Sequence, residues 1–260
     1  MREVYEEFKQ HRVVRRKEIL YFFEGNVEKT NSSIRWLMAS GKAQRIKPGL
    51  LYLRQPNEWG NTEVSISPWL IAAQSVKGAV IAFHSAMAIR GEAYSESSQI
   101  QIAVSIENKR IPKSFTYQGM TYKYFRENLD FGVAKKVVAN VKVEVLDSER
   151  TVLEGLKHSD RYMGMDELLK SLEGVKWLDL SRIMLYLDSY YASNSMEMRL
   201  GWLLEQKQDE WYVKPERLKQ MQKNRPLDPV YLISSKRSGN YRDSKWNLMI
   251  PKKLRNRQDY

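Results

Sequence analysis

Residues 15–54 read RRKEILYFFEGNVEKTNSSIRWLMASGKAQRIKPGLLYLR, and this stretch decides the fold of the first part of the chain. Apolar spacing and turn residues predict a helix, a turn, a second helix, a strand, a turn and a strand, at residues 16–23, 24–26, 27–40, 43–46, 47–49 and 50–53. Val4, Tyr5 and Phe8 have helical spacing and predict one more helix before this stretch. This order is typical of a winged helix-turn-helix, so we expect that fold over residues 1–55.

The second predicted helix has two unlike faces. At about 100° per residue, the face that packs on the core contains Val27, Thr30, Ile34, Leu37 and Met38. The face left for solvent or a ligand contains Lys29, Ser32, Ser33, Arg35 and Trp36. Asn26 suits the N-cap, and Gly41 suits the position after the last turn because glycine accepts a positive φ at little cost.

A helix face with Lys, Ser and Arg, followed by a hairpin with further cations, suits a protein that reads DNA in the major groove. Cations also gather at the start of the first helix of this stretch, where a phosphate would offset their unfavourable position at the positive end of the helix dipole. The predicted DNA contacts are therefore Arg15, Arg16, Lys17, Lys29, Ser32, Ser33, Arg35, Arg45 and Lys47. The alternative is a small helical domain with an ordinary solvated face.

Composition limits the class of protein. The chain has 260 residues and a net charge of +12, which favours polyanionic partners without choosing among DNA, RNA and acidic membranes. Residues 1–55 and 236–260 each carry +6, so we divide the chain into a winged domain (1–55), an effector domain (56–235) and a basic tail (236–260). Cysteine is absent, the three histidines are scattered, and no apolar run reaches the roughly 20 residues of a membrane span. We expect a cytoplasmic protein with no metal, no cofactor and no membrane partner.

The remainder of the chain predicts an α+β domain. Apolar alternation and short apolar runs predict strands near residues 79–83, 100–104, 115–117, 122–125 and 141–145, with a turn at Gln118-Gly119. Helical spacing follows at residues 68–76, 84–90, 147–156, 165–172, 178–191, 195–206 and 215–223. We therefore expect a small, mainly antiparallel sheet followed by a run of helices, with the apolar run 246–250 forming a strand or packing on the body.

Three segments in this order resemble one family. RIKPGLLYL at residues 45–53, IAFHSAMAIRG at 81–91 and VLDSERTVL at 145–153 are similar to segments of the AbiEi-type antitoxins of type IV toxin–antitoxin systems, over about residues 10–160. Arg90-Gly91 departs from the usual His-Gly pair. The resemblance implies a transcriptional regulator that represses its own operon through upstream operator DNA, with several copies binding cooperatively. It also implies an antitoxin that counters a nucleotidyltransferase toxin without a stable complex.

Catalysis by the second domain is the alternative. Nucleotidyltransferases hold metal ions with two carboxylates that alternate on a strand, and Gln99 and Gln101 stand at such positions here. An amide is a poor Mg²⁺ ligand, so these residues indicate either an inactive relative or a strand with a polar exposed face. We expect Asp147 to cap a helix, and His84 and His158 to pack. The aromatic set expected in a core is Trp177, Tyr186, Tyr190, Tyr191 and Trp202. We predict no enzyme, and keep an RNA- or nucleotide-binding, nucleotidyltransferase-like protein as the alternative.

Overall fold

The computed structural model describes residues 2–257 and has a mixed α+β fold, which confirms the predicted class. The chain packs as two compact units. Unit 1 consists of the chain up to Ala82 together with Ser97–Val145, and unit 2 consists of Phe83–Glu96 together with the described residues from Leu146 onward. The chain therefore enters unit 2 once before unit 1 is complete. These units differ from the predicted segments 1–55, 56–235 and 236–260, because residues from the predicted effector domain contribute to both.

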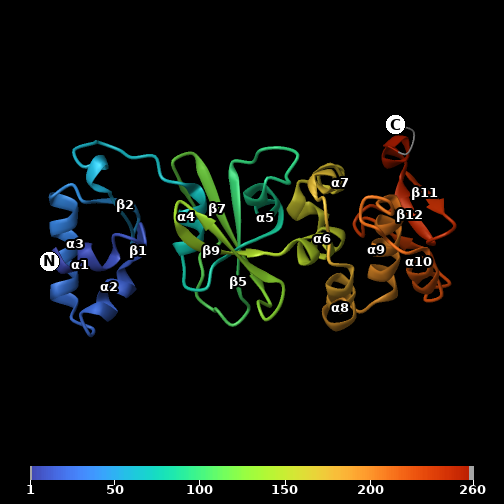
Figure 1. The fold of residues 1–260 in the computed structure, drawn as a ribbon, viewed down its shortest axis with the longest axis horizontal. Coiled ribbons are helices and arrows are strands. Elements are labelled where there is room, and N and C mark those ends of the chain that lie inside the picture. Colours follow the sequence, from blue (N-terminus) through green and yellow to red (C-terminus); the bar gives the residue numbers. More distant parts are fainter. Residues whose placement is uncertain (1, 258–260) are drawn as a thin grey trace. The chain divides into compact units, whose positions relative to one another are not determined.

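Unit 1 begins with three helices and a three-stranded sheet of order β1-β3-β2 (Figure 1). These elements are α1 (Arg2–Phe8), β1 (Val13–Arg15), α2 (Arg16–Phe22), α3 (Val27–Ala39), β2 (Ala43–Lys47) and β3 (Leu50–Leu53), followed by the 3₁₀ turn η1 (Pro56–Glu58). The Asn26 side chain accepts a hydrogen bond from the Lys29 N–H at 2.9 Å, and Gly41 follows α3 with φ +67°. Both helix boundaries were predicted from these two residues. Strand β1 was not predicted, because three residues are too few for alternation to be visible.

Apolar side chains from all of these elements form one core. It contains Val4, Tyr5, Phe8, Val14, Ile19, Leu37, Ala43, Leu51 and Leu53. Burying a leucine such as Leu37 contributes about 1.5–3 kcal/mol, so this core fixes α3 against the β2–β3 hairpin. The fixed position of α3 against the hairpin determines which side chains of the two elements face the same surface.

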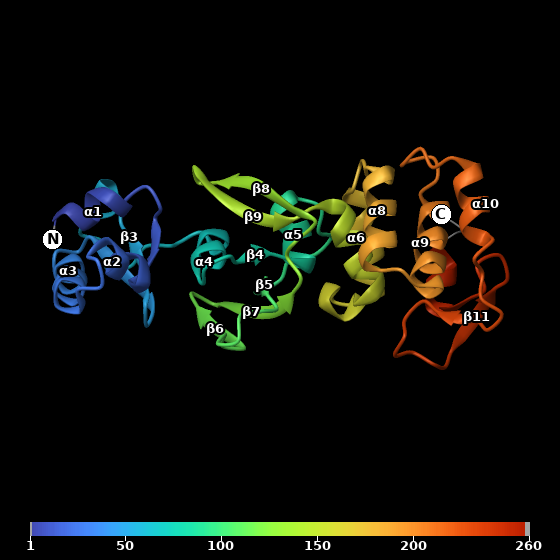
Figure 2. The ribbon, with the colours of Figure 1, turned by 90° about the horizontal axis from the view of Figure 1, so that it is seen from below.

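The second part of unit 1 is a six-stranded sheet of order β6-β7-β5-β4-β9-β8. Its elements are α4 (Pro68–Gln74), β4 (Val80–Ile81), β5 (Gln99–Ser105), β6 (Ser114–Tyr117), β7 (Met120–Glu127), β8 (Val133–Val138) and β9 (Val141–Leu146). Figure 2 shows the β6–β7 and β8–β9 hairpins at opposite edges of this sheet. The turn at Gln118-Gly119 was predicted and has the two positive φ angles of a tight hairpin. Strand β8 was missed, because Val133–Val138 has two consecutive lysines in its middle.

The sheet was predicted to be mainly antiparallel, and it also contains two parallel pairs that were not predicted. Strand β5 pairs with β7 in parallel, and β4 pairs with β9 in parallel, whereas β4·β5 and β6·β7 are antiparallel. The prediction assumed that strands adjacent in sequence pair with each other. Here β7 lies between β6 and β5, and β4 pairs with β9, which follows much later in the chain, so two of the neighbouring pairs are parallel.

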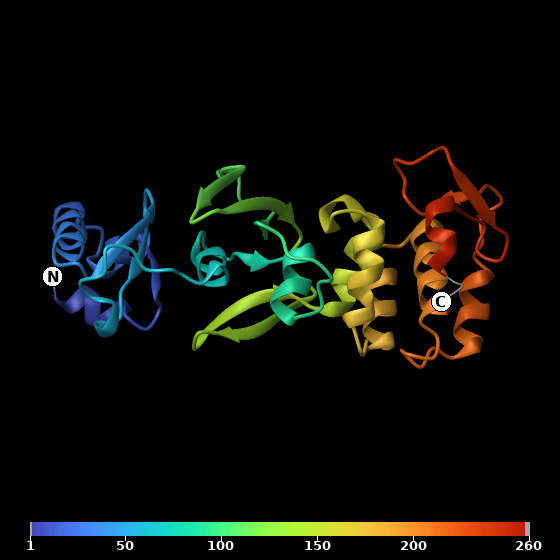
Figure 3. The ribbon, with the colours of Figure 1, turned by 90° about the horizontal axis from the view of Figure 1, so that it is seen from above.

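Unit 2 contains helices and a small sheet, drawn in yellow to red in Figures 1 and 3 apart from its first helix. Its helices are α5 (Phe83–Arg90), α6 (Ser148–Lys157), α7 (Met165–Ser171), α8 (Leu180–Tyr190), α9 (Asn194–Gln206) and α10 (Pro215–Gln222), with 3₁₀ turns η2 (Ser159–Tyr162), η3 (Leu172–Gly174) and η4 (Lys252–Arg257). Strands β10 (Val230–Tyr231), β11 (Asn240–Asp243) and β12 (Leu248–Pro251) form the sheet, with β12 in the centre.

The apolar run 246–250 packs as predicted. Trp246 is fully buried, and a Cβ added to Gly201 of α9 would lie 2.1 Å from its ring. The run continues into β12, so the segment expected to be a basic tail is part of the body of unit 2. Among the described residues, no helix has both the length and the apolar content needed to cross a membrane.

Candidate nucleic-acid interface

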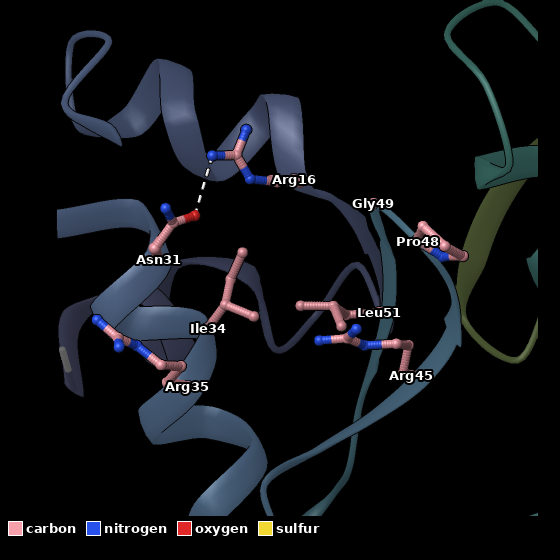
Figure 4. A pocket seen from close by; sticks show the side chains of 8 residues that line it. All are labelled: Arg16, Asn31, Ile34, Arg35, Arg45, Pro48, Gly49 and Leu51. Atoms are coloured by element: carbon pink, nitrogen blue, oxygen red, sulfur yellow. Dashed lines mark hydrogen bonds between the residues drawn. The ribbon is translucent and has the colours of Figure 1, made fainter. Parts of the chain in front are cut away.

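A groove of about 450 Å³ lies between α3, the start of α2 and the β2–β3 hairpin (Figure 4). The side chains that line it are Arg16, Asn31, Ile34, Arg35, Arg45, Pro48, Gly49 and Leu51. Three of them are guanidinium groups and none is a carboxylate, so the lining attracts anions. We call this surface the three-arginine groove.

Each arginine is positioned by a different element. Arg16 is the first residue of α2; its backbone N–H donates to Gly49 O at 2.9 Å and its guanidinium donates to Asn31 Oδ1 at 2.9 Å. Arg35 projects from the exposed side of α3 and donates to Ser32 Oγ at 3.4 Å. Arg45 is exposed on β2. The groove therefore brings together three of the predicted contacts from separate parts of the sequence.

Two other predicted contacts lie on α3. Lys29 is exposed in its first turn, and Ser32 is half-buried beside Arg35. Both belong to the side of α3 that carries Arg35. Val27, expected on the packed face, is instead 51% exposed.

The prediction for Ser33 was wrong. Ser33 is 1% exposed and cannot reach a ligand in this structure. It lies three residues after Thr30 and four before Leu37, both fully buried, so helical geometry places it on the packed face. Trp36 also packs against the core of this region. The packed face of α3 is therefore rotated from the predicted one, toward Ser33 and away from Val27.

The sequence suggested that Lys47 and Arg45 share a surface. In the structure they do not. The register of β2 against β3 shifts between Arg45 and Lys47, which is a β-bulge. Strict alternation would place residues 45 and 47 on one face, and the extra residue turns Lys47 away. Its Nζ lies 3.8 Å from the Phe115 ring centroid and 3.1 Å from Tyr124 Oη, both on the six-stranded sheet. Burial lowers the pKa of Lys47 to about 8.

Arg15 and Lys17 lie beside the groove and do not line it. The Arg15 guanidinium forms an ion pair with Glu18, and the Glu18 carboxylate also accepts the Arg15 backbone N–H at 2.7 Å. This carboxylate offsets the positive charge of Arg15 at the start of α2. From the sequence, a phosphate was expected to do so. Lys17 is exposed.

The glutamines considered for a lost metal site lie on β5. Gln101 is 6% exposed and Gln99 is half-buried, so the expectation of a polar exposed face was wrong for Gln101. Helix α4 and the neighbouring strands β4 and β7 contact β5. Among residues 2–257, no group of three or more His, Asp and Glu side chains gathers as a metal site would require.

The polar residues singled out in unit 2 have structural partners. Asp147 caps α6 as predicted: its side chain accepts the Arg150 N–H at 2.8 Å. His84 is buried, with Nε2 3.3 Å from Glu167 Oε1. His158 follows α6, and burial lowers its pKa. Of the aromatic set, Tyr191 and Trp202 are buried, but Trp177 and Tyr190 are 65% and 43% exposed, so that prediction was only partly right.

Sequence reasoning missed Asn31, Pro48 and Gly49 as lining residues. Asn31 is four residues before Arg35, so the helical spacing placed both on one side of α3. That spacing was the available signal. Pro48 and Gly49 were identified only as a turn, and their part in the groove follows from the docking of Arg16 on Gly49.

Comparisons with known proteins concern the fold. No protein-family model matches the chain, and no curated protein matches it. The structure is similar to the crystal structure of the RV2827C protein from Mycobacterium tuberculosis, with a TM-score of 0.60 and 17% sequence identity. The alignment covers 92% of this chain and 86% of that chain, so the likeness extends over both units. At this identity it shows a shared fold alone.

Proposed function

We propose that residues 1–55 form a winged helix-turn-helix that binds operator DNA. Helix α3 would enter the major groove, and the β2–β3 hairpin would act as the wing. One observation carries the proposal: three guanidinium groups from α2, α3 and β2 converge on one groove that no carboxylate lines. Arginine forms paired hydrogen bonds with phosphate or with guanine, so such a groove suits a nucleic acid.

The residues divide into two roles under this proposal. Lys29, Ser32 and Arg35 share the outer side of α3, where they would reach base edges. Arg16 and Arg45 flank them on α2 and β2, where they would hold phosphates. Lys47 is engaged with Phe115 and Tyr124, so we assign it to supporting the hairpin.

The charge of unit 1 supports the same partner. Residues 1–82 and 97–145 contain 21 Lys and Arg against 12 Asp and Glu, a net charge of +9 out of +12 for the whole chain. Unit 2 carries the remaining +3. A polyanion is therefore attracted mainly to the unit that contains the three-arginine groove.

An electrophoretic shift of the DNA upstream of the chain's own gene tests the proposal, with unrelated DNA as competitor. We expect a shift that survives competitor and that is weakened in Arg35→Ala/Arg45→Ala. The matched control is Lys219→Ala/Lys223→Ala, which removes two exposed charges from the α10 region of unit 2. Competitor that abolishes the shift, or equal weakening by the control pair, would contradict specific binding and favour the RNA-directed alternative.

We further propose that the chain represses its own operon and acts as an antitoxin against a nucleotidyltransferase toxin, without catalysis of its own. This part rests on the resemblance of residues 45–53, 81–91 and 145–153 to the AbiEi-type antitoxins. Co-expression with a nucleotidyltransferase encoded beside it tests the proposal: growth should be rescued, and Gln99→Ala/Gln101→Ala should abolish rescue only if the sheet mimics the toxin. Metal-dependent nucleotide transfer by the purified chain would favour the alternative of a nucleotidyltransferase-like enzyme.

A further inference from the structure

A second hollow, of about 210 Å³, lies in unit 1 where α4 approaches the β8–β9 hairpin. Its polar lining consists of Arg15, Gln74, Lys135, Lys142 and Glu144. Ala73, Gly78, Ala79 and Val143 complete the lining, and the three small residues among them leave room for a ligand. Three cations and one carboxylate share this surface, so its charge also favours an anion.

The two lysines are available to a ligand. Lys135 on β8 and Lys142 on β9 are both exposed, and no ion pair or hydrogen bond engages either side chain within the described part of the chain. A two-residue turn at Ala139-Asn140, with φ of +47° and +64°, joins the two strands and makes the hairpin tight. A tight hairpin holds its side chains in place better than a loop would.

Two carboxylates oppose an anion at this surface. Glu144 lies on the rim of the hollow, and Glu18 forms an ion pair with Arg15. Unlike the three-arginine groove, this hollow therefore has a balance of charge that a single substitution can shift in either direction. Removing a lysine should weaken the binding of an anion here, and removing the Glu144 carboxylate should strengthen it.

Two consecutive residues of the chain line the two different hollows. Arg16 lines the three-arginine groove and Arg15 lines the second hollow. Their Cα atoms are about 3.8 Å apart, because they are neighbours in the chain. Phosphates recur about every 3.4 Å of rise along each strand of a duplex, and one helical turn spans about 34–36 Å. A single duplex is long enough to contact both.

We propose that Lys135 and Lys142 bind the phosphate backbone of the same duplex, outside the segment that α3 reads. The inference rests on the proposed DNA-binding function and extends its footprint to the six-stranded sheet. The contact is independent of sequence, so it raises affinity and adds protected phosphates on one flank without changing which operator is chosen.

The test compares affinity for operator DNA at about 50 and 200 mM salt. Each lost phosphate contact lowers the slope of log affinity against log salt by about 0.9, so Lys135→Ala/Lys142→Ala should lower it by about 1.8. The ratio of wild-type to variant affinity should then fall about twelvefold between the two salt concentrations. Hydroxyl-radical footprinting should show phosphates on one flank losing protection.

The matched control is Lys109→Ala/Lys113→Ala. It removes the same charge from exposed positions between β5 and β6, in the same unit but away from both hollows. Its slope should fall by less than that of the hairpin variant, and its footprint should stay unchanged. Glu144→Gln should act in the opposite direction and tighten binding, because it removes the carboxylate on the rim. All variants should unfold at the wild-type temperature, since these side chains are exposed.

Two failures can be told apart. If wild type shifts the operator and Arg35→Ala/Arg45→Ala does not, but Lys135→Ala/Lys142→Ala binds and footprints like wild type, the second contact is overturned and the proposed function stands. Equal slopes for the hairpin and control pairs, or unchanged binding by Glu144→Gln, also overturn the second contact. If wild type itself shows no competitor-resistant shift, the proposed function and the second contact fall together.

Discussion

Arg35 and Arg45 of unit 1 and Arg150 of unit 2 occupy opposite environments. In unit 1, Arg35 and Arg45 are exposed at a groove that no carboxylate lines. In unit 2, Arg150 is 1% exposed and lies 3.7 Å from Glu154, whose Oε1 also accepts the Tyr191 hydroxyl at 2.7 Å. The buried arginine is compensated from within the protein, whereas the exposed ones can be compensated by a ligand. Burial and the nearest carboxylate therefore distinguish these arginines, which residue type does not.

The largest effect is expected when the buried pair is broken. Arg150→Met leaves Glu154 as a buried charge without its cation, so unfolding free energy should fall by about 3–5 kcal/mol in chemical denaturation. Arg182→Ala is the control, because Arg182 is 47% exposed and its pairs with Glu149 and Asp179 are loose; it should cost less than about 1 kcal/mol. Equal losses for the two variants would remove the distinction between the two kinds of arginine.

Arg35→Ala and Arg45→Ala should show the reverse pattern. We expect no change in the unfolding midpoint, because both side chains are exposed. Operator affinity should fall by about 1–3 kcal/mol where the arginine contacts a base, whereas a phosphate contact should lower the salt slope by about one. Fluorescence anisotropy at several salt concentrations separates the two cases. Binding that matches wild type throughout would show that the groove is not the interface.

Lys47 lies between these two extremes and should respond to pH. Burial lowers its pKa in the folded protein to about 8, against an ordinary value of 10.5, while the Phe115 ring at 3.8 Å favours the ammonium. Between about pH 8 and 10.5 the unfolded chain then binds more protons than the folded one, so stability should rise with pH in this window. Thermal unfolding of wild type against Lys47→Met from pH 7 to 9.5 measures this difference. A flat difference would mean that the ring outweighs the burial.

The smallest effects separate two adjacent serines. Ser33→Ala should leave operator binding unchanged, because Ser33 lies on the packed face of α3 and is buried. Ser32→Ala removes the hydroxyl that accepts from Arg35, so it should weaken binding slightly. Titrations of both variants against the same operator DNA measure the difference. A larger loss for Ser33→Ala than for Ser32→Ala would show that the assigned orientation of α3 is wrong.

Local signals in the sequence predicted the helices well. Asn26 and Gly41 marked the ends of α3 because capping and positive φ depend on single residues. Strand pairing was less predictable, since the parallel neighbours β5 and β7 depend on contacts that no local pattern records. The detour of Phe83–Glu96 into unit 2 leaves no compositional mark either.

In the candidate site too, the features set by local sequence were predictable and those set by tertiary packing were not. Arg35 and Arg45 were found because a helix period and a hairpin place them, and the groove joins them with Arg16. Ser33 was misplaced because the packed face of α3 is set by the tertiary core, which turns it toward Thr30 and Leu37. Lys47 was misplaced because one bulge reverses the alternation of side chains between the two faces of a strand. Nothing in the sequence Lys47-Pro48-Gly49 predicts this bulge.

The insertion of Trp246 against Gly201 has a consequence for synthesis of the protein. Unit 1 has all of its residues once Val145 has left the ribosome, so it can fold while translation continues. Unit 2 cannot: α5 is made early, α9 follows about a hundred residues later, and the site beside Gly201 is filled only when Trp246 emerges. Until then apolar surface on α9 stays open to solvent. The nascent chain should therefore depend on chaperones longest at its C-terminal unit, and ribosome-bound chains stalled before residue 246 should be cut by protease in unit 2 while unit 1 resists.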